Sequence, residues 1–227
     1  KTFSALGCYA TSVLTALPVQ NTMGVRKIYP IAVEAIADQI ETVLDDIFPD
    51  AIKIGMVHTS QLVETIVKTL SKYPKIPIVF DPVMVATSGH RLIEEETIQT
   101  IAEKLFPIAE IITPNMDEAS ILAKMEVKTL EDMKIAGEKI LKSGCKNILL
   151  KGGHQELPTV TSLLFEGNGK QSSFETIKFA TNNTHGSGCT LSSAIAAFLA
   201  RGENLFNAVE LAQKYVFEAI KNGKDVV

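Results

Sequence analysis

The chain has 227 residues, of which 46% are hydrophobic, and a formal net charge of −4 at pH 7. This length and composition suit one α/β domain over residues 1–227, and the acidic balance excludes an extended basic surface for nucleic acid or anionic membrane. The three cysteines lack metal-ligand spacing and indicate neither a disulfide framework nor a zinc site, which favours a cytoplasmic location. No apolar run approaches the roughly 18 residues of a membrane span.

The first segment predicts a short helix followed by a strand. Residues 1–6 have the pattern of a last helical turn, and Gly7 closes it because a positive φ costs glycine least. Residues 8–17 are mostly apolar and β-branched, which is typical of a buried strand in a parallel sheet. A polar exit follows at residues 18–22. Because α/β sheets bind ligands at such strand ends, Gln20 is either a ligand-reading amide or an ordinary exposed loop residue.

The middle of the chain alternates between strand and helix patterns. Strands are predicted over residues 51–54, 76–80, 110–113 and 147–150, and helices over 33–46, 61–72, 93–106, 131–142 and from residue 114. Residues 163–165 and 172–179 flank a Gly-Asn-Gly turn and predict an antiparallel hairpin at one edge. Helices over 191–200 and 205–220 close the chain. The alternation predicts a three-layer α/β/α fold with a mainly parallel sheet.

Several candidate functional side chains follow the predicted strands. Met56 could contact an aromatic ring or belong to the core. Asp81 is either a turn cap or a carboxylate on the metal side of a site, and Lys151 either lies over a polyphosphate or is an exposed loop lysine. Asn115 and Glu118 open a helix, and capping explains both of them.

Residues 183–190, Asn-Thr-His-Gly-Ser-Gly-Cys-Thr, precede a helix of small residues. Gly186 and Gly188 flank Ser187 and predict a bare turn at the helix N-terminus, where open N–H groups and the helix dipole attract anions. The dipole also favours the thiolate of Cys189, which could then take a proton beside a bound phosphate. The alternative is a tight turn with a buried cysteine.

This octapeptide resembles the anion-hole motif of the ribokinase-like superfamily, in the branch that phosphorylates hydroxymethylpyrimidine and its phosphate for thiamine synthesis. Most of the superfamily has Asp where this chain has Cys189. Further matches occur in the same order along the chain, at residues 1–7, 16–22, 53–56, 81–84, 112–119 and 150–154. The resemblance therefore spans nearly the whole chain.

The resemblance implies a ribokinase-like kinase that uses ATP and Mg²⁺, acts on a small pyrimidine, and is compatible with a homodimer. It assigns proton removal to Cys189 and the transferring phosphoryl group to the amides of Gly186, Ser187 and Gly188. The remaining implied roles are pyrimidine contact for Gln20, Met56 and Val83, ATP contact for Thr113, Asn115, Lys151 and Thr184, and the metal side for Glu118 and Asp81.

Two other functions remain open at this point: a pyridoxal or pyridoxine kinase of the same fold, and a non-catalytic module that binds a pyrimidine or nucleotide. The chain also departs from the family pattern. The family begins with an earlier strand, a Gly-rich turn and the start of a helix, so we expect the polypeptide to extend upstream. Ser162 lies near the position of a family Asp, and Asn182 stands where many relatives have Lys.

Overall fold

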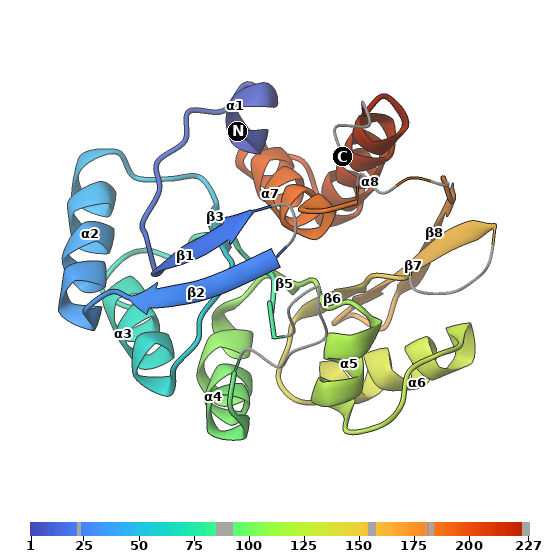
Figure 1. Cartoon of the computed structure of the whole chain (residues 1–227), viewed down its shortest axis with the longest axis horizontal. Coiled ribbons are helices and arrows are strands. Elements are labelled where there is room, and N and C mark those ends of the chain that lie inside the picture. The colour runs from blue at the N-terminus through green and yellow to red at the C-terminus, as the bar shows by residue number, and fades with distance from the viewer. Residues whose placement is uncertain (22–23, 85–92, 154–157, 180, 182–183, 224–227) are drawn as a thin grey trace.

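The computed structural model describes the chain except residues 22–23, 85–92, 154–157, 180, 182–183 and 224–227. Its main sheet has six strands in the order β3-β4-β5-β6-β7-β8 (Figure 1). The strand bounds are β3 Ile52–Ile54, β4 Ile78–Phe80, β5 Ile111–Ile112, β6 Asn147–Leu150, β7 Thr159–Glu166 and β8 Gln171–Ile177. β3 to β6 pair in parallel, and the β7–β8 hairpin joins β6 antiparallel. This confirms the mainly parallel sheet with an edge hairpin.

Helices cover both faces of the six-stranded sheet. Figure 1 shows α1, α7 and α8 on one side and α3 to α6 on the other. The helix bounds are α1 Thr2–Ala5, α2 Val33–Asp46, α3 Ser60–Leu70, α4 Glu95–Thr100, α5 Met116–Ala123, α6 Leu130–Leu141, α7 Ser187–Ala200 and α8 Leu205–Lys221. The expected three-layer α/β/α architecture is confirmed (Figure 1).

The alternation of side chains along each strand produces two separate cores. On β4, Ile78 and Phe80 belong to the core beneath α2 to α6, whereas Val79 belongs to the core beneath α7 and α8. Successive side chains of a strand point to opposite faces, so a fully apolar strand can serve both layers. This explains why the central strands read as continuous apolar runs.

The expected helix over residues 93–106 changes its winding along its length. α4 passes into a π-helical turn, Ile101–Leu105, and then a 3₁₀ turn, Phe106–Ile108. Pro107 has no N–H to donate, which favours the end of regular helix in this region. Within the described part of the chain, no helix is both long enough and apolar enough to span a bilayer.

The expected strand over residues 8–17 is wrong. β1 is Ala16–Asn21, and it pairs antiparallel with β2, Gly24–Pro30, in a separate two-stranded ribbon. The residues before β1 are largely exposed, Tyr9 by 79% and Leu14 by 51%, so their apolar composition does not reflect burial. Gln20 consequently lies within β1 and not in a loop after a buried strand.

Candidate active site

The carboxyl ends of three parallel strands bring together side chains that lie far apart in the sequence. Asp81 follows β4, Thr113 follows β5 and Lys151 follows β6. The Thr113 hydroxyl donates to Asp81 Oδ1 at 2.9 Å, and Lys151 Nζ donates to the same oxygen at 3.0 Å. This cluster lies where open α/β sheets bind their ligands, at the carboxyl edge.

The start of α7, a helix that covers one face of the sheet (Figure 1), contacts the same cluster. Ser192 Oγ lies 3.0 Å from Asp81 Oδ2, and a Cβ added to Gly188 would lie 3.3 Å from Lys151 Nζ. The predicted anion-binding turn therefore stands directly over Lys151 and Asp81. Sequence reasoning missed Ser192, because a single serine in a helix of small residues carries no recognisable pattern.

Opposing effects determine the charge of Asp81. Burial is the largest influence and would raise its pKa, but Lys151 and Lys53, together with the hydrogen bonds from Lys151 and Thr113, outweigh it, so the pKa of Asp81 is lowered. Lys53 lies in β3 and was also missed by the sequence analysis. Its Nζ lies 2.6 Å from where a Cβ would stand on Gly55, so the bare glycine gives the ammonium room at the strand end.

Glu118 caps a helix and also belongs to this electrostatic group. It forms a capping box with Asn115: Glu118 N donates to Asn115 Oδ1 and Asn115 N to Glu118 Oε2, both at 2.8 Å. Met84 N donates to Oε1 at 3.3 Å. Burial raises the pKa of Glu118 to about 7, while Lys151 lowers it and Asp81 raises it. Glu118 therefore caps α5, and this capping does not exclude a role for its carboxylate in the site.

The helix start supplies open donors, although not all of the expected ones. Gly186 is the N-cap of α7 with φ +80°, a conformation that favours glycine. Ser187 N donates to Thr184 O at 3.1 Å, so that amide already has an acceptor. Within the described residues, the amides of Gly188 and Cys189 donate no hydrogen bond. The Cys189 thiol is exposed.

The expected acceptor residues come from two places. Met56 and Val83 follow the neighbouring strands β3 and β4 and are half-buried. Gln20 is exposed on the β1–β2 ribbon, and no hydrogen bond in the described part of the chain joins it to either of them. The Thr15 hydroxyl donates to Met56 O at 3.0 Å, which ties the segment leading into the ribbon to the end of β3.

Four residues remain: the expected ATP contacts Thr113 and Thr184, and the departures from the family pattern at Ser162 and Asn182. Thr113 has no exposed surface, and its hydroxyl donates to Asp81 Oδ1. Thr184 is exposed beside the α7 start. Ser162 is buried in β7, and Asn182 lies outside the described residues.

The carboxylates suit a magnesium ion that is shared with phosphates. No group of three or more metal-ligating side chains occurs among the described residues. Asp81 and Glu118 are nevertheless close enough for the charge of one to change the pKa of the other. Mg²⁺ is commonly held by one or two carboxylates plus substrate phosphates and water. The residues present therefore fit a metal bound with the nucleotide, and not a dedicated protein cage.

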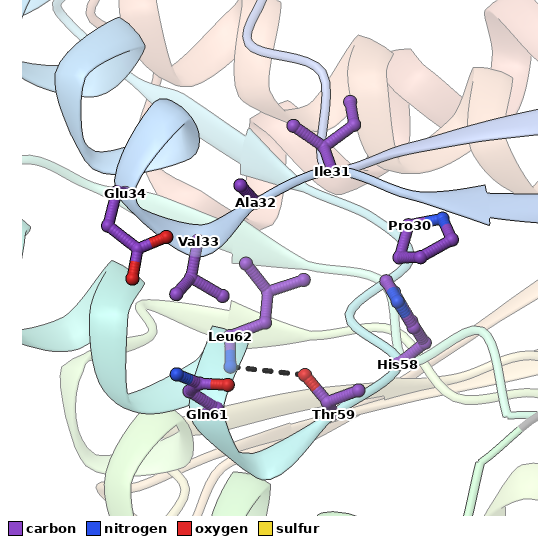
Figure 2. A pocket seen from close by; sticks show the side chains of 9 residues that line it. All are labelled: Pro30, Ile31, Ala32, Val33, Glu34, His58, Thr59, Gln61 and Leu62. Carbon is purple, nitrogen blue, oxygen red and sulfur yellow. Dashed lines mark hydrogen bonds between the residues drawn. The ribbon is translucent and has the colours of Figure 1, made fainter.

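A separate recess of about 260 Å³ lies between the β2–α2 junction and the start of α3 (Figure 2). Its lining comprises Pro30, Ile31, Ala32, Val33, Glu34, His58, Thr59, Gln61 and Leu62. Thr59 Oγ1 is occupied as the α3 cap, accepting from Leu62 N at 3.2 Å, and the buried His58 Nδ1 has no partner among the described residues. None of the expected site residues lines this recess.

Comparison with known protein families gives a match over the whole chain. The family model for phosphomethylpyrimidine kinase matches residues 1–227. The chain belongs to the phosphomethylpyrimidine kinase family. It is 38% identical over 226 residues to the hydroxymethylpyrimidine/phosphomethylpyrimidine kinase of Bacillus subtilis, covering 98% of this chain and 82% of that protein.

Solved structures of kinases share the fold. The phosphomethylpyrimidine kinase of Clostridium difficile superimposes with a TM-score of 0.83 at 40% identity, covering 96% of this chain and 90% of that one. An ADP complex of Bacillus subtilis pyridoxal kinase gives a TM-score of 0.89 at 32% identity, covering 100% and 86%. As a member of the phosphomethylpyrimidine kinase family, the chain is a phosphotransferase, and the family resemblance seen in the sequence is confirmed.

Proposed function

We propose that this family member phosphorylates 4-amino-5-hydroxymethyl-2-methylpyrimidine, its monophosphate or both, with ATP, in thiamine biosynthesis. The observation that carries the proposal is the placement of the α7 start over Lys151 and Asp81, with open amides at Gly188 and Cys189. This chain has higher sequence identity to phosphomethylpyrimidine kinases than to the pyridoxal kinase, which favours the pyrimidine over pyridoxal as the substrate.

Phosphoryl transfer asks a protein mainly for positioning and charge stabilisation. The amides at the start of α7, with Gly186 and Ser187 shaping the turn, would receive the transferring phosphoryl group. Lys151, whose Nζ lies 3.0 Å from Asp81 Oδ1, would balance the negative charge of the phosphoryl group. Cys189 is exposed and, as the thiolate, would take the proton from the acceptor hydroxyl while that oxygen bonds to the γ-phosphorus of ATP and ADP leaves.

The nucleotide and its metal would lie on the other side of the cluster. Asn115 and Thr184 would contact ATP together with Lys151. Glu118 and Asp81 would hold Mg²⁺ along with the phosphates, and the ion, when bound, supplies neutralisation of the charge on the phosphate oxygens. On the acceptor side, Met56 and Val83 would pack on the ring, and Gln20 would approach it from the β1–β2 ribbon.

A direct comparison of kcat/KM for the free pyrimidine, its monophosphate and pyridoxal tests this assignment. Turnover of either pyrimidine at least about tenfold above pyridoxal, equivalent to about 1.4 kcal/mol in transition-state binding, supports it. Higher kcat/KM for pyridoxal would make the chain a pyridoxal kinase. Ligand-induced thermal stabilisation without turnover of any acceptor would identify a binding module instead.

We also propose a cytoplasmic homodimer. The cysteines Cys8, Cys145 and Cys189 are all free, in keeping with a reducing compartment. Leu17, Val19 and Tyr29 on the β1–β2 ribbon are each about half exposed, and an apolar surface of this kind is typical of an interface. Light scattering on the purified protein gives the oligomeric state directly.

A further inference from the structure

Ser192 is a fully buried polar residue of α7. Its neighbours Leu191, Ala194 and Ile195 belong to the core beneath α7 and α8. Its Oγ lies 3.0 Å from Asp81 Oδ2, 3.1 Å from Gly188 O and 3.2 Å from Cys189 O. The hydroxyl thus contacts both the sheet end and the first turn of the helix.

A serine hydroxyl has one proton, so these three acceptors compete for it. In an ordinary helix a serine often donates to a carbonyl three or four residues earlier, which here means Cys189 or Gly188. A carboxylate is the stronger acceptor, because hydrogen bonds to charged groups are shorter and stronger than those to neutral ones. The favoured hydrogen bond therefore runs from Ser192 to Asp81 and crosses between layers.

The other oxygen of Asp81 reaches the same helix by a second route. Oδ1 accepts from Lys151 Nζ at 3.0 Å, and that ammonium lies directly beneath Gly188. Asp81 is thus bonded to α7 through the Ser192 hydroxyl, and its partner Lys151 lies close to Gly188 at the start of the same helix. Thr113 donates to Oδ1 as well and fixes the orientation of the carboxylate.

We propose that Ser192 is a positioning residue that holds the first turn of α7 in register with the carboxyl ends of the strands. The inference rests on the proposed function, since the open amides of Gly188 and Cys189 matter only if this turn receives a phosphoryl group. Without the hydroxyl, the turn keeps its helix but loses its direct link to Asp81. The amide donors of Gly188 and Cys189 are then displaced from the positions that the transition state requires, whereas ground-state binding is affected less.

The test compares Ser192→Ala with Ser193→Ala. Ser193 is the adjacent serine of the same helix and is only half-buried, and within the described residues no hydrogen bond joins it to Asp81. Alanine suits a helix and adds no volume, so both variants should fold. Hydrogen exchange of the amides of residues 190–193, measured without substrate, should accelerate by about 10- to 100-fold in Ser192→Ala, as expected when a hydrogen bond to a charged group is removed.

Kinetics provide the second readout. Ser192→Ala should lower kcat by about 10- to 100-fold with both KM values nearly unchanged, because misplacement of groups costs rate more than binding. Ser193→Ala should match the wild type in exchange and in kcat. Unchanged exchange at residues 190–193, or faster exchange spread evenly over the whole chain, would overturn the positioning role. A wild-type protein that phosphorylates no pyrimidine would overturn the proposed function, and the exchange result would still decide the role of Ser192.

Discussion

Cys189 and the carboxylate cluster occupy different chemical environments although they lie within one site. Cys189 is exposed on the outer side of the α7 start, whereas Asp81 is buried beneath it between Lys151 and Ser192. A group that exchanges a proton with a substrate needs access, and a carboxylate that orders its surroundings needs burial and partners. Substitutions at these positions should therefore affect different measurable quantities.

Replacement of Cys189 by alanine should lower kcat by about 10²- to 10⁴-fold, the usual cost of removing a general base. ATP affinity and thermal stability should change little, since the side chain is exposed and makes no recorded hydrogen bond in the described part of the chain. Coupled assays and nucleotide titration measure the two effects. Cys8→Ala is the matched control and should retain kcat. Normal turnover by Cys189→Ala would make the thiol structural.

Glu118 should make stability depend on pH. Its pKa is raised from 4.5 to about 7, so between these values the folded chain holds a proton that the unfolded chain has lost. Stability should therefore fall as pH rises from about 4.5 to about 7 and level off above, by up to about 3 kcal/mol. The pKa of Asp81 is lowered, so its stabilising contribution is complete above its ordinary pKa of 3.8 and is lost only at lower pH.

Urea unfolding of the wild type and Glu118→Gln between pH 5 and pH 8, in a chelator, isolates this contribution. Glutamine cannot lose a proton and can still accept a hydrogen bond from Asn115 N. All other ionisable groups are the same in both proteins, so the difference between the two curves belongs to Glu118. Two parallel curves would show that the carboxyl group is ionised in the folded state throughout.

Gln20 should matter for the acceptor and little for the fold. Its side chain is exposed on β1, so Gln20→Ala should leave the free energy of unfolding within about 0.5 kcal/mol of the wild type. If its amide pairs with the pyrimidine edge, kcat/KM for the pyrimidine should fall by about 1–3 kcal/mol in transition-state binding. KM for ATP serves as the internal reference, and an equal loss for both ligands would exclude acceptor recognition.

At the scale of elements, α6 and β7 approach each other closely at one glycine. A Cβ added to Gly137 would overlap the ring of Phe165, one of the largest fully buried side chains. Helix propensity alone predicts that Gly137→Ala stabilises α6 by about 1 kcal/mol. We expect the opposite sign, a loss of about 1–3 kcal/mol, because overpacking forces the ring to move.

Denaturant unfolding of Gly137→Ala in two backgrounds tests the cause. With Phe165→Leu the ring is absent, so the added methyl should cost much less than it does in the wild type. The same cost in both backgrounds would trace the effect to the helix itself. Gly202, which has open space around its Cβ position but φ +87°, is a useful contrast because there only backbone strain should matter.

Element prediction succeeded where local pattern and burial coincide. The apolar stripe of α2, in which Ile36, Ile40 and Leu44 are buried, predicted the bounds of this helix correctly. The bounds of the four-residue strand β6 were also predicted correctly. Residues 8–17 failed because an apolar, β-branched sequence indicates that a strand would be favourable but not which partner would pair with it. Lys53 and Ser192 were missed because their importance arises only from interactions with Asp81, which is distant from both in the sequence.

At the scale of the whole molecule, Cys145 should report opening of the larger core. It is buried in the core beneath α2 to α6, and burial raises its pKa to about 12. Alkylation requires an accessible thiolate, so Cys145 should react only when this core opens. At pH 8 and low reagent, Cys189 should be modified in minutes and Cys145 far more slowly, and mild denaturant should accelerate only Cys145. Mass spectrometry of digests after timed quenching measures both, and equal rates would show that the core is open in the native state.

The polar cluster joins residues from both layers of the molecule, and this has a consequence for synthesis and folding. Ser192 and Asp81 are 111 residues apart, and Lys151 and Asp81 are 70 residues apart. Contacts of such sequence separation form late, because much chain must be ordered before they are made. In a nascent chain that still lacks α7, Asp81 lacks the hydrogen bond from the Ser192 hydroxyl. The proposed nucleotide site is complete only once α7 has docked on the sheet, so we expect nucleotide to protect against proteolysis only those chains that include a docked α7.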